Sequence, residues 1–440
     1  MTTLASVLKQ AKKLVVPSPA ETAKISRLAR ELLRKTRRAA KRFPRVREVL
    51  MGGSFAKGTW LPKHVDLDVF VRFDPATPVE QFEKMGLDIG SAATRGYPMG
   101  KKYAQHPYTE ATIEGIRVNI VPCFDVKAGE WMSAADRSPY HVELIEGLTE
   151  DRKNQIRLLK LFMNGVGVYG AEIQRQGFSG YVAEVLVIKH GDFESVVRWF
   201  ADYNIPADEG IFSLPDPVDE GRDLGIAVSG HSLGTMVLAC REFLRRPSLA
   251  YFGEMKGKVH TSLDENVYAV LFSHRIMSED TLWGELRKTL KHVVRHVEAQ
   301  GFGIARAMGA SDNISRSAIL LIPEFTELPA VEQRVGPTVD RRKDVESFIS
   351  TNSRQSRLVW VDDDARVRLL RPRRYTRLPD LLEDLVKGKA RPIGASKEIE
   401  DGMKKNGIVL RGRTLARAAS SSKWLRDGIR EITSDAIGTR

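Results

Sequence analysis

Apolar and polar positions alternate with different periods along the chain, and these periods predict helices and strands. Residues 18–21 form a capping box with proline at the first helical position, and apolar residues follow at helical spacing up to Pro44. One long helix is therefore predicted to open the chain. Residues 46–51 and 65–73 predict strands, and two apolar-rich runs about a two-residue turn predict a hairpin over 108–121. Strands with one helix indicate a small α+β first domain.

The pattern changes from strands to helices near residue 151 and later becomes mixed. Helices are predicted around 156–163, 181–188 and 236–244. An α/β unit follows, with strands at 267–272 and 318–322, a helix at 282–297, a hairpin over 358–370 and a basic helical tail to residue 440. These shifts predict three domains, at 1–147, 148–255 and 256–440.

Charge is concentrated at the two ends of the chain. The 440 residues carry a net charge of +13, of which residues 1–45 contribute +11 and residues 371–440 contribute +8, so the middle is mildly acidic. Basic ends around an acidic centre indicate a polyanion held at the periphery, and nucleic acid is the leading candidate. For the N-terminal segment the alternative is the solvated face of an amphipathic helix.

Composition excludes several classes of protein. The 42% hydrophobic content is ordinary for a globular chain. No apolar run approaches the roughly 18 residues of a membrane span, and the first residues lack a secretory h-region, so we expect no membrane association. Cys123 and Cys240 are too few for a disulfide scaffold or a thiolate zinc site, which favours a reducing, cytoplasmic location.

Asp66 and Asp68 are the first candidates for chemistry. They lie two residues apart on a predicted strand, so both carboxylates project from one face. Paired carboxylates near an anion-binding loop suit Mg²⁺ and nucleotide chemistry. Ser54, next to Gly53, and Lys57 come shortly before this strand, where a triphosphate could sit. An Asp-x-Asp pair alone is more often structural. The pattern becomes specific because a strand, the Gly53-Ser54 pair and the Asp-x-Asp strand follow one another in this order.

Residues 51–54 with residues 65–69 resemble the signature of the polymerase-beta-type nucleotidyltransferases. Further motifs are similar to those of the archaeal class I CCA-adding enzymes, which build and repair the tRNA 3′ end from CTP and ATP. They lie at residues 58–61, 106–108, 121–123, 135–139, 168–172 and 177–181. The resemblance covers residues 1 to about 375.

The resemblance implies an α+β multidomain fold: a nucleotidyltransferase palm of mixed sheet and helices, a helical central domain, and an α/β C-terminal RNA-binding body with a basic tail. It implies that this last part grips the acceptor and TΨC arms of tRNA, that CTP and ATP are the substrates and that no membrane is involved. A homodimer is a further expectation, although the sequence does not determine the oligomeric state.

The resemblance also implies roles for single residues. Asp66 and Asp68 would bind the metal ions, and Ser54 and Lys57 would contact the triphosphate. Family nucleotide contacts fall on His141, Lys160 and Tyr169. Taken by themselves, these three are more often a surface histidine, a solvated lysine and a core ring.

Arg241 is our own candidate for reading a base or phosphate, because a guanidinium fork suits both. The alternative for Arg241 is an ion pair with Glu242 or another acid.

Asn119 departs from the family pattern, which has a third metal-binding aspartate there. An amide oxygen can ligate Mg²⁺ but adds no charge, so the ion that activates the primer hydroxyl should bind weakly. Two explanations stay open: an engineered change that permits substrate binding without turnover, or a natural substitution compensated nearby. With Glu114-Gly115 as a two-residue turn, Glu110 is predicted to lie opposite Asn119 and could supply the missing carboxylate. An exposed strand glutamate is the alternative for Glu110.

Two other functions remain open on the sequence alone. One is a poly(A)-type or oligoadenylate-forming member of the same superfamily, which would use ATP only. The other is a catalytically silent tRNA-binding homologue, which Asn119 would support. Nucleotide selectivity and turnover distinguish these from template-independent CCA addition.

Overall fold

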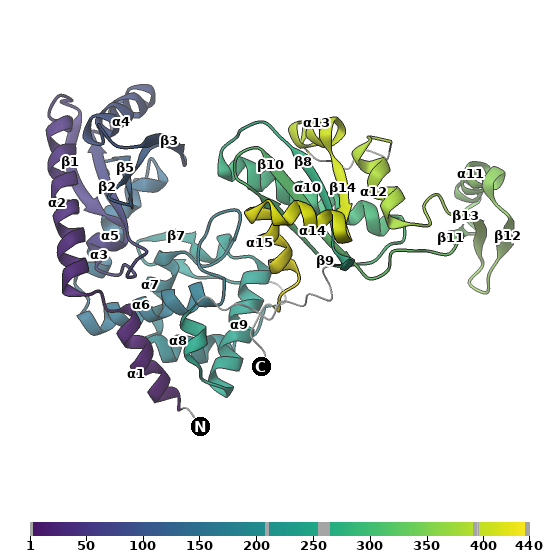
Figure 1. Ribbon diagram of the computed structural model, residues 1–440, viewed down its shortest axis with the longest axis horizontal. Coiled ribbons are helices and arrows are strands. Elements are labelled where there is room, and N and C mark those ends of the chain that lie inside the picture. Colours follow the sequence, from purple (N-terminus) through teal and green to yellow (C-terminus); the bar gives the residue numbers. More distant parts are fainter. Residues whose placement is uncertain (1–2, 207–210, 254–264, 390–393, 395, 436–440) are drawn as a thin grey trace. The chain divides into compact units, whose positions relative to one another are not determined.

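The computed structural model describes residues 3–206, 211–253, 265–389, 394 and 396–435 (Figure 1). The chain forms two compact units, Met1–Gly257 with Asp435–Arg440, and Lys258–Ser434. Both units mix helices with sheets, so the predicted α+β multidomain class is confirmed. None of the helices in the described ranges combines the length and apolar character needed to cross a bilayer.

The first unit contains a five-stranded mixed sheet in the order β1-β2-β5-β4-β3. Its strands are β1 (Val46–Gly52), β2 (Asp66–Phe73), β3 (Met99–Tyr103), β4 (Pro107–Ile113) and β5 (Ile116–Phe124). The central pair, β2 and β5, runs parallel, and the other pairs are antiparallel. The predicted strands and hairpin are confirmed. β3 was not predicted, because it lies at the sheet edge and its exposed residues show no apolar alternation.

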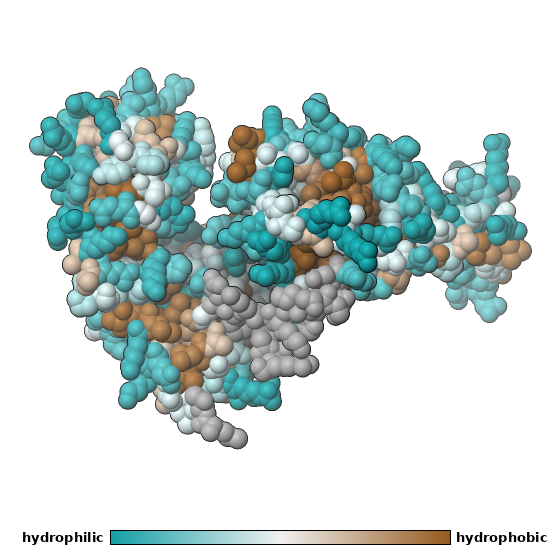
Figure 2. Space-filling model, viewed as in Figure 1, coloured by the Kyte–Doolittle hydropathy of each residue, from teal (hydrophilic) through white to brown (hydrophobic). Residues whose placement is uncertain are grey.

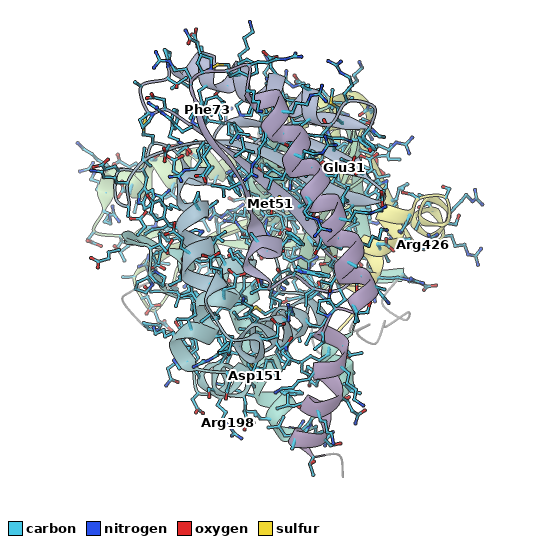
Figure 3. All side chains as sticks on the ribbon, turned by 90° about the vertical axis from the view of Figure 1, so that its left-hand side faces the viewer. Glu31, Met51, Phe73, Asp151, Arg198 and Arg426 are labelled. Carbon is cyan, nitrogen blue, oxygen red and sulfur yellow. The ribbon has the colours of Figure 1, made fainter. Side chains whose placement is uncertain are left out.

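Two helices, α2 (Pro19–Ala40) and α4 (Val79–Ala93), cover one face of this sheet. One half of the predicted capping box of α2 is present, since the Ser18 side chain accepts a hydrogen bond from the Glu21 backbone N–H, whereas the Glu21 carboxylate accepts from the Lys63 backbone N–H. Leu28 and Leu32 of α2 share a buried core with Leu67 of β2. Because side chains alternate along a strand, the aspartates flanking Leu67 lie on the opposite face. Figure 3 shows α2 crossing in front of the sheet.

The rest of the first unit has its own core and is mainly helical, with one two-stranded antiparallel sheet of β6 (Pro215–Asp216) and β7 (Asp219–Asp223). Its helices are α1 (Leu4–Val15), α5 (Ser138–Glu146), α6 (Glu150–Gly165), α7 (Gly180–His190), α8 (Phe193–Ala201) and α9 (Gly230–Arg245). Val7 and Val15 of α1 pack into this core and not against the sheet. The chain therefore opens with two helices and not the single one predicted. The break falls at Val16, which is extended because it precedes Pro17.

The second unit is built on a four-stranded antiparallel sheet in the order β14-β8-β10-β9 and a three-stranded sheet in the order β11-β13-β12. The strands are β8 (Tyr268–Ser273), β9 (Ile304–Ser311), β10 (Arg316–Pro323), β11 (Val331–Thr338), β12 (Leu358–Val361), β13 (Arg366–Pro372) and β14 (Ile408–Arg411). The helices are α10 (Glu279–Ala299), α11 (Arg342–Asn352), α12 (Leu378–Val386), α13 (Lys397–Asn406), α14 (Gly412–Ser420) and α15 (Lys423–Ile432). The predicted hairpin is β12–β13. Leu358 and Val361 of β12 remain about half exposed. Figure 2 shows hydrophobic residues at the surface of this three-stranded sheet.

The C-terminal segment is more than the basic helical tail that the sequence predicted. Its helices are present, but β14 also pairs with β8 at the edge of the four-stranded sheet. Leu415, Leu425 and Ile432 are buried in the core that this sheet shares with α14 and α15. The segment is therefore part of the folded core of the second unit.

Candidate active site

The loop after β1 packs directly on the acidic strand. Gly53 has a φ of +62°, and a Cβ built there would lie 1.8 Å from Oδ2 of Asp68. Both the backbone conformation and the space therefore require glycine. The helix α3 (Gly53–Lys57) begins at this residue, so Ser54 is held in its first turn beside the β2 carboxylates.

Asp68 and Asn119 face each other across the parallel pair β2 and β5. Asn119 Nδ2 donates a hydrogen bond of 2.9 Å to Asp68 Oδ1. Burial raises the pKa of Asp68, and the hydrogen bond from Asn119 opposes that rise. The other amide atom, Asn119 Oδ1, is buried and has no hydrogen-bond partner among the described residues. An unsatisfied acceptor beside a buried carboxylate is a site that a cation would complete.

Glu110 lies directly opposite Asn119, as the hairpin parity predicted. Its carboxylate is partly exposed, and one oxygen lies 3.8 Å from Nζ of Lys102. Asp66 forms an ion pair with Arg117, which sequence analysis did not anticipate. Arg117 precedes Asn119 by two residues on the same strand, so it projects from the same face. The hydrogen bond from Arg117 to Asp66 raises the pKa of Arg117.

The oxygen atoms on this strand face fit a divalent cation. The face has two carboxylates and one amide, so it carries one negative charge fewer than three carboxylates would. Among the described residues, no three His, Cys, Asp or Glu side chains gather into a metal site. A cation on this face would rest on Asp66, Asp68 and the free amide oxygen of Asn119, which are the hard oxygen donors that Mg²⁺ prefers.

A second cluster, the lysine cluster, joins α3 to the helical core and consists of Lys57, Thr59, Lys160 and Glu184. Glu184 of α7 accepts hydrogen bonds of 2.7 Å from Lys57 and 2.7 Å from Lys160 of α6. Thr59 donates a third, of 2.6 Å, to Glu184. Burial opposes ionisation of Glu184, but the two ammonium groups outweigh it and lower its pKa to about 2. Burial lowers the pKa of Lys160, and Glu184 opposes that shift. When both lysines are protonated, the cluster carries a net positive charge, which suits a triphosphate.

His141, another expected nucleotide contact, lies on α5. The His141 ring stacks on Tyr181 at 3.7 Å between centroids, and Tyr181 donates to Asp216 at 2.8 Å. Burial and the charge of Lys57 lower the pKa of His141 to about 4, so the ring is neutral at pH 7. Its Nε2 lies 3.5 Å from Asp216 and has no hydrogen-bond partner in the described ranges.

Tyr169 is largely buried, and burial raises the pKa of its hydroxyl. A Cβ on Gly180 would lie 2.8 Å from Tyr169 Oη and 3.6 Å from Lys160 Nζ. The two side chains therefore meet at the same glycine, at the start of α7. The structure thus brings Tyr169 next to the lysine cluster.

Arg241 lies apart from these groups. On α9 it donates to the backbone carbonyls of Ala201, at 2.7 Å, and Tyr203, at 3.5 Å. It therefore satisfies carbonyls at the C-terminal end of α8, which is a structural role. The alternative pair with Glu242 is not formed, because Glu242 pairs with Arg245.

Three contributors were missed from sequence: Glu184, Thr59 and Arg117. A signal existed for Glu184, because it is the one acid in the apolar run 181–188. A charge in a buried helix needs a partner, so that position could have been identified as a functional candidate. Arg117 had no such signal, since an arginine on a half-exposed strand is ordinary.

A strand, a glycine-serine loop opening a short helix, and a second strand bearing two carboxylates on one face define a nucleotidyltransferase domain. A family model described as a nucleotidyltransferase domain matches residues 33–142. Two further family models match later parts of the chain. The second domain of tRNA nucleotidyltransferase matches residues 154–253, and the C-terminal domain of the CCA-adding enzyme matches residues 264–412.

Whole-chain relatives agree with these models. The CCA-adding enzyme of Pyrobaculum neutrophilum is 34% identical over 397 residues, which are 87% of this chain and 94% of the relative. That of Halorubrum lacusprofundi is 33% identical over 91% and 93% of the two chains. The chain belongs to the CCA-adding enzyme family. A solved cytoplasmic RNA terminal U-transferase has a TM-score of 0.43 and 13% identity over 57% of this chain and 98% of its own, which is too distant to bear on function.

Proposed function

We propose that this protein adds and repairs the 3′-terminal CCA of tRNA, using CTP and ATP without a nucleic-acid template. The observation that carries the proposal is that one chain holds, in order, the three domain models of this family. Relatives named CCA-adding enzymes are similar over most of its length.

The reaction joins the tRNA 3′-hydroxyl oxygen to the α-phosphorus of the incoming nucleotide. The bond between the α-phosphorus and the bridging oxygen breaks, and pyrophosphate leaves. The lysine cluster supports the proposal because Lys57 and Lys160 are already fixed by Glu184 before any anion arrives. Such preorganisation lowers the reorganisation needed as charge develops on the phosphates. Ser54 would position the phosphates through the first turn of α3, and His141 and Tyr169 would line the nucleotide pocket.

Members of this superfamily use divalent metal ions, and we propose Mg²⁺ for this chain. Asp66, Asp68 and Asn119 would hold it, because their oxygens share one face of the sheet and the amide oxygen is free. A bound Mg²⁺ would supply charge stabilisation to the attacking and leaving oxygens. Asn119 leaves this face one negative charge short of the family pattern, so we expect slow turnover and not complete silence.

Extension of a tRNA that lacks its 3′ end tests the proposal. The full chain is incubated with Mg²⁺ and labelled CTP alone, ATP alone, or both, and the products are resolved by gel. We expect two additions with CTP alone and a third only when ATP is also present. Repeated addition of AMP alone would assign the chain to the poly(A)-type enzymes. Tight tRNA binding with no addition at any enzyme concentration would assign it to the silent homologues.

A homodimer and the domain boundaries at 147 and 255 stay predictions. The oligomeric state is measurable by light scattering of the full chain. For the RNA partner, we propose that the second unit holds the acceptor and TΨC arms, as the C-terminal family model supports.

A further inference from the structure

One column of arginines runs along the outside of α2. Arg30, Arg34 and Arg38 lie four residues apart on the helix, and Arg42 continues the spacing just beyond its end. At 1.5 Å of rise per residue, the column extends about 18 Å. All four side chains are exposed, and none forms an ion pair with a described residue.

This arrangement is unfavourable for the helix itself. Like charges four residues apart repel one another on a helix surface. The two acids of α2 form no ion pair with the column, because Glu31 is paired with Lys35 and the Glu21 carboxylate accepts from the Lys63 backbone N–H. An amphipathic helix that needed only a solvated face would mix both signs. The column therefore indicates an external anion.

The column ends at a hollow between the C-terminal ends of α2 and α4. The hollow has a volume of about 570 Å³. Its lining includes Arg42, Phe43, Ser91 and Arg95, together with the carboxylate residue Asp88. Two guanidinium groups and a hydroxyl can bind a phosphate, and Phe43 offers an aromatic surface at the same place.

The buried and exposed sides of α2 together indicate which class of anion binds to the column. Its apolar side, including Ile25, Leu28 and Leu32, is buried in the sheet core, so nothing remains to enter a bilayer. The column consists of arginines, whose planar forks bind phosphate oxygens through two hydrogen bonds. A regular row of such groups fits a phosphate backbone.

We infer that the arginine column of α2, with the hollow at its end, is a second RNA-binding surface that holds the phosphate backbone of an RNA duplex. It lies on the face of the five-stranded sheet opposite Asp66 and Asp68, so RNA bound there leaves the carboxylates open. The inference goes beyond CCA addition and does not depend on it.

Binding of a blunt, fluorescent RNA duplex to the full chain, measured by anisotropy over a range of salt concentrations, tests this surface. The variant is Arg30→Gln, Arg34→Gln, Arg38→Gln. Each lost phosphate contact removes about 0.9 from the log-log salt slope, so the slope should fall by about 2 to 3 and the affinity at low salt by about 10-fold or more. Its melting temperature should not decrease, because repulsion within α2 is removed.

The matched control removes three arginines that are each paired with an acid on their own helix: Arg198→Gln, Arg245→Gln and Arg342→Gln. We expect its salt slope and affinity to equal those of the parent, and both variants to extend tRNA at the parent's rate when tRNA is saturating. An unchanged slope in the α2 variant would overturn the inference. So would an equal loss in the control, which would point to net charge alone. Unchanged RNA binding with lost binding of polyglutamate would assign the surface to an acidic protein.

Discussion

The acidic strand face and the lysine cluster lie in the same unit, yet they handle charge in opposite ways. On the strand face, burial raises the pKa of Asp68 and leaves Asn119 Oδ1 without a partner. In the lysine cluster, Glu184 is fully hydrogen-bonded and its pKa is lowered to about 2. The strand face keeps a buried acceptor without a partner, whereas every carboxylate oxygen of Glu184 has one.

This difference in how the charges are compensated predicts which substitutions change turnover and which change the stability of the fold. A carboxylate with a raised pKa destabilises the folded protein when it is ionised, so ionised Asp68 lowers the free energy of unfolding. A buried carboxylate with two ammonium partners stabilises the fold that surrounds it, and its loss leaves buried charge uncompensated. Substitutions on the strand face should therefore change turnover, and substitutions in the lysine cluster should change stability as well.

The largest effect is expected when both strand carboxylates are removed. Asp66→Ala with Asp68→Ala should reduce incorporation of both CMP and AMP by about 1,000-fold or more, about 4 kcal/mol of barrier, because one site serves every step. The free energy of unfolding should change little, because relief of the unfavourable burial of Asp68 offsets the lost Asp66–Arg117 ion pair and the lost hydrogen bond from Asn119. Gel-resolved extension and urea unfolding measure the two quantities. The exposed pair Glu143→Ala, Glu146→Ala is the control, and full activity in the Asp66/Asp68 variant would place the site elsewhere.

Asn119→Asp should give the next largest effect, in the opposite direction. A third carboxylate strengthens cation binding, and we expect turnover to rise by about 100-fold, about 3 kcal/mol of barrier. Without a cation this variant should be less stable than the parent, because it loses the hydrogen bond to Asp68 and sets two carboxylates side by side.

Glu110→Gln is the companion variant. Its carboxylate lies near Lys102 and no hydrogen bond from Asn119 reaches it, so we expect a small change in turnover. If Glu110→Gln silences the chain while Asn119→Asp changes nothing, then Glu110 is the compensating ligand. Magnesium-dependent extension by the two variants and the parent separates the cases.

Glu184→Gln should act on stability. Removing one partner from a buried charge cluster costs about 3 kcal/mol, and the KM for CTP and for ATP should rise as Lys57 and Lys160 lose their fixed positions. Because the folded-state pKa of Glu184 is lowered, its contribution is present above its ordinary pKa of 4.5 and is lost as pH falls toward 2. Urea unfolding between pH 7 and pH 3 should show this acid-dependent loss in the parent and not in the variant. The same loss in both would remove Glu184 from the account.

The smallest effect concerns a single proton on His141. Burial and Lys57 lower its pKa to about 4, so its ring should not titrate between pH 8 and pH 5.5. Because the unfolded chain binds this proton more readily, the contribution of His141 to stability falls as pH drops below its ordinary 6.5. Proton NMR of the ring, assigned with a His141→Gln variant, reports the midpoint. A midpoint near 6.5 would mean that the ring is solvated and unconnected with Lys57.

Local chemistry made part of the fold predictable from sequence. The cap at Ser18, the strands β1 and β2, and the register that sets Glu110 opposite Asn119 all follow from short-range rules. Helix α4 was not predicted from the sequence, because Gly86 and Gly90 weaken its helical pattern. They are there because α4 lies so close to the sheet that a Cβ on Gly90 would be 2.2 Å from Thr109 Oγ1.

In the site and in the C-terminal segment too, features set by local sequence were predictable and features set by tertiary packing were not. The Asp66 and Asp68 pair follows from strand alternation, whereas the contacts of Glu184 with Lys57 and Thr59 join residues more than 120 positions apart and depend on tertiary packing. Strand β14 is only four residues long, and its pairing with β8 is not visible in its own sequence. Truncation at residue 376 would remove this strand, so it would unfold part of the second unit and would not report on RNA binding alone.

Direct measurement of cation binding tests the central claim that the strand face is completed by a metal ion. Mn²⁺ is titrated into the full chain with CTP present, and free Mn²⁺ is followed by electron paramagnetic resonance for the parent, Asp68→Asn and Asn119→Asp. The account predicts that Asp68→Asn weakens binding by about 10-fold or more and that Asn119→Asp strengthens it, in line with the change in carboxylate number. Equal Mn²⁺ affinity in all three proteins would contradict it.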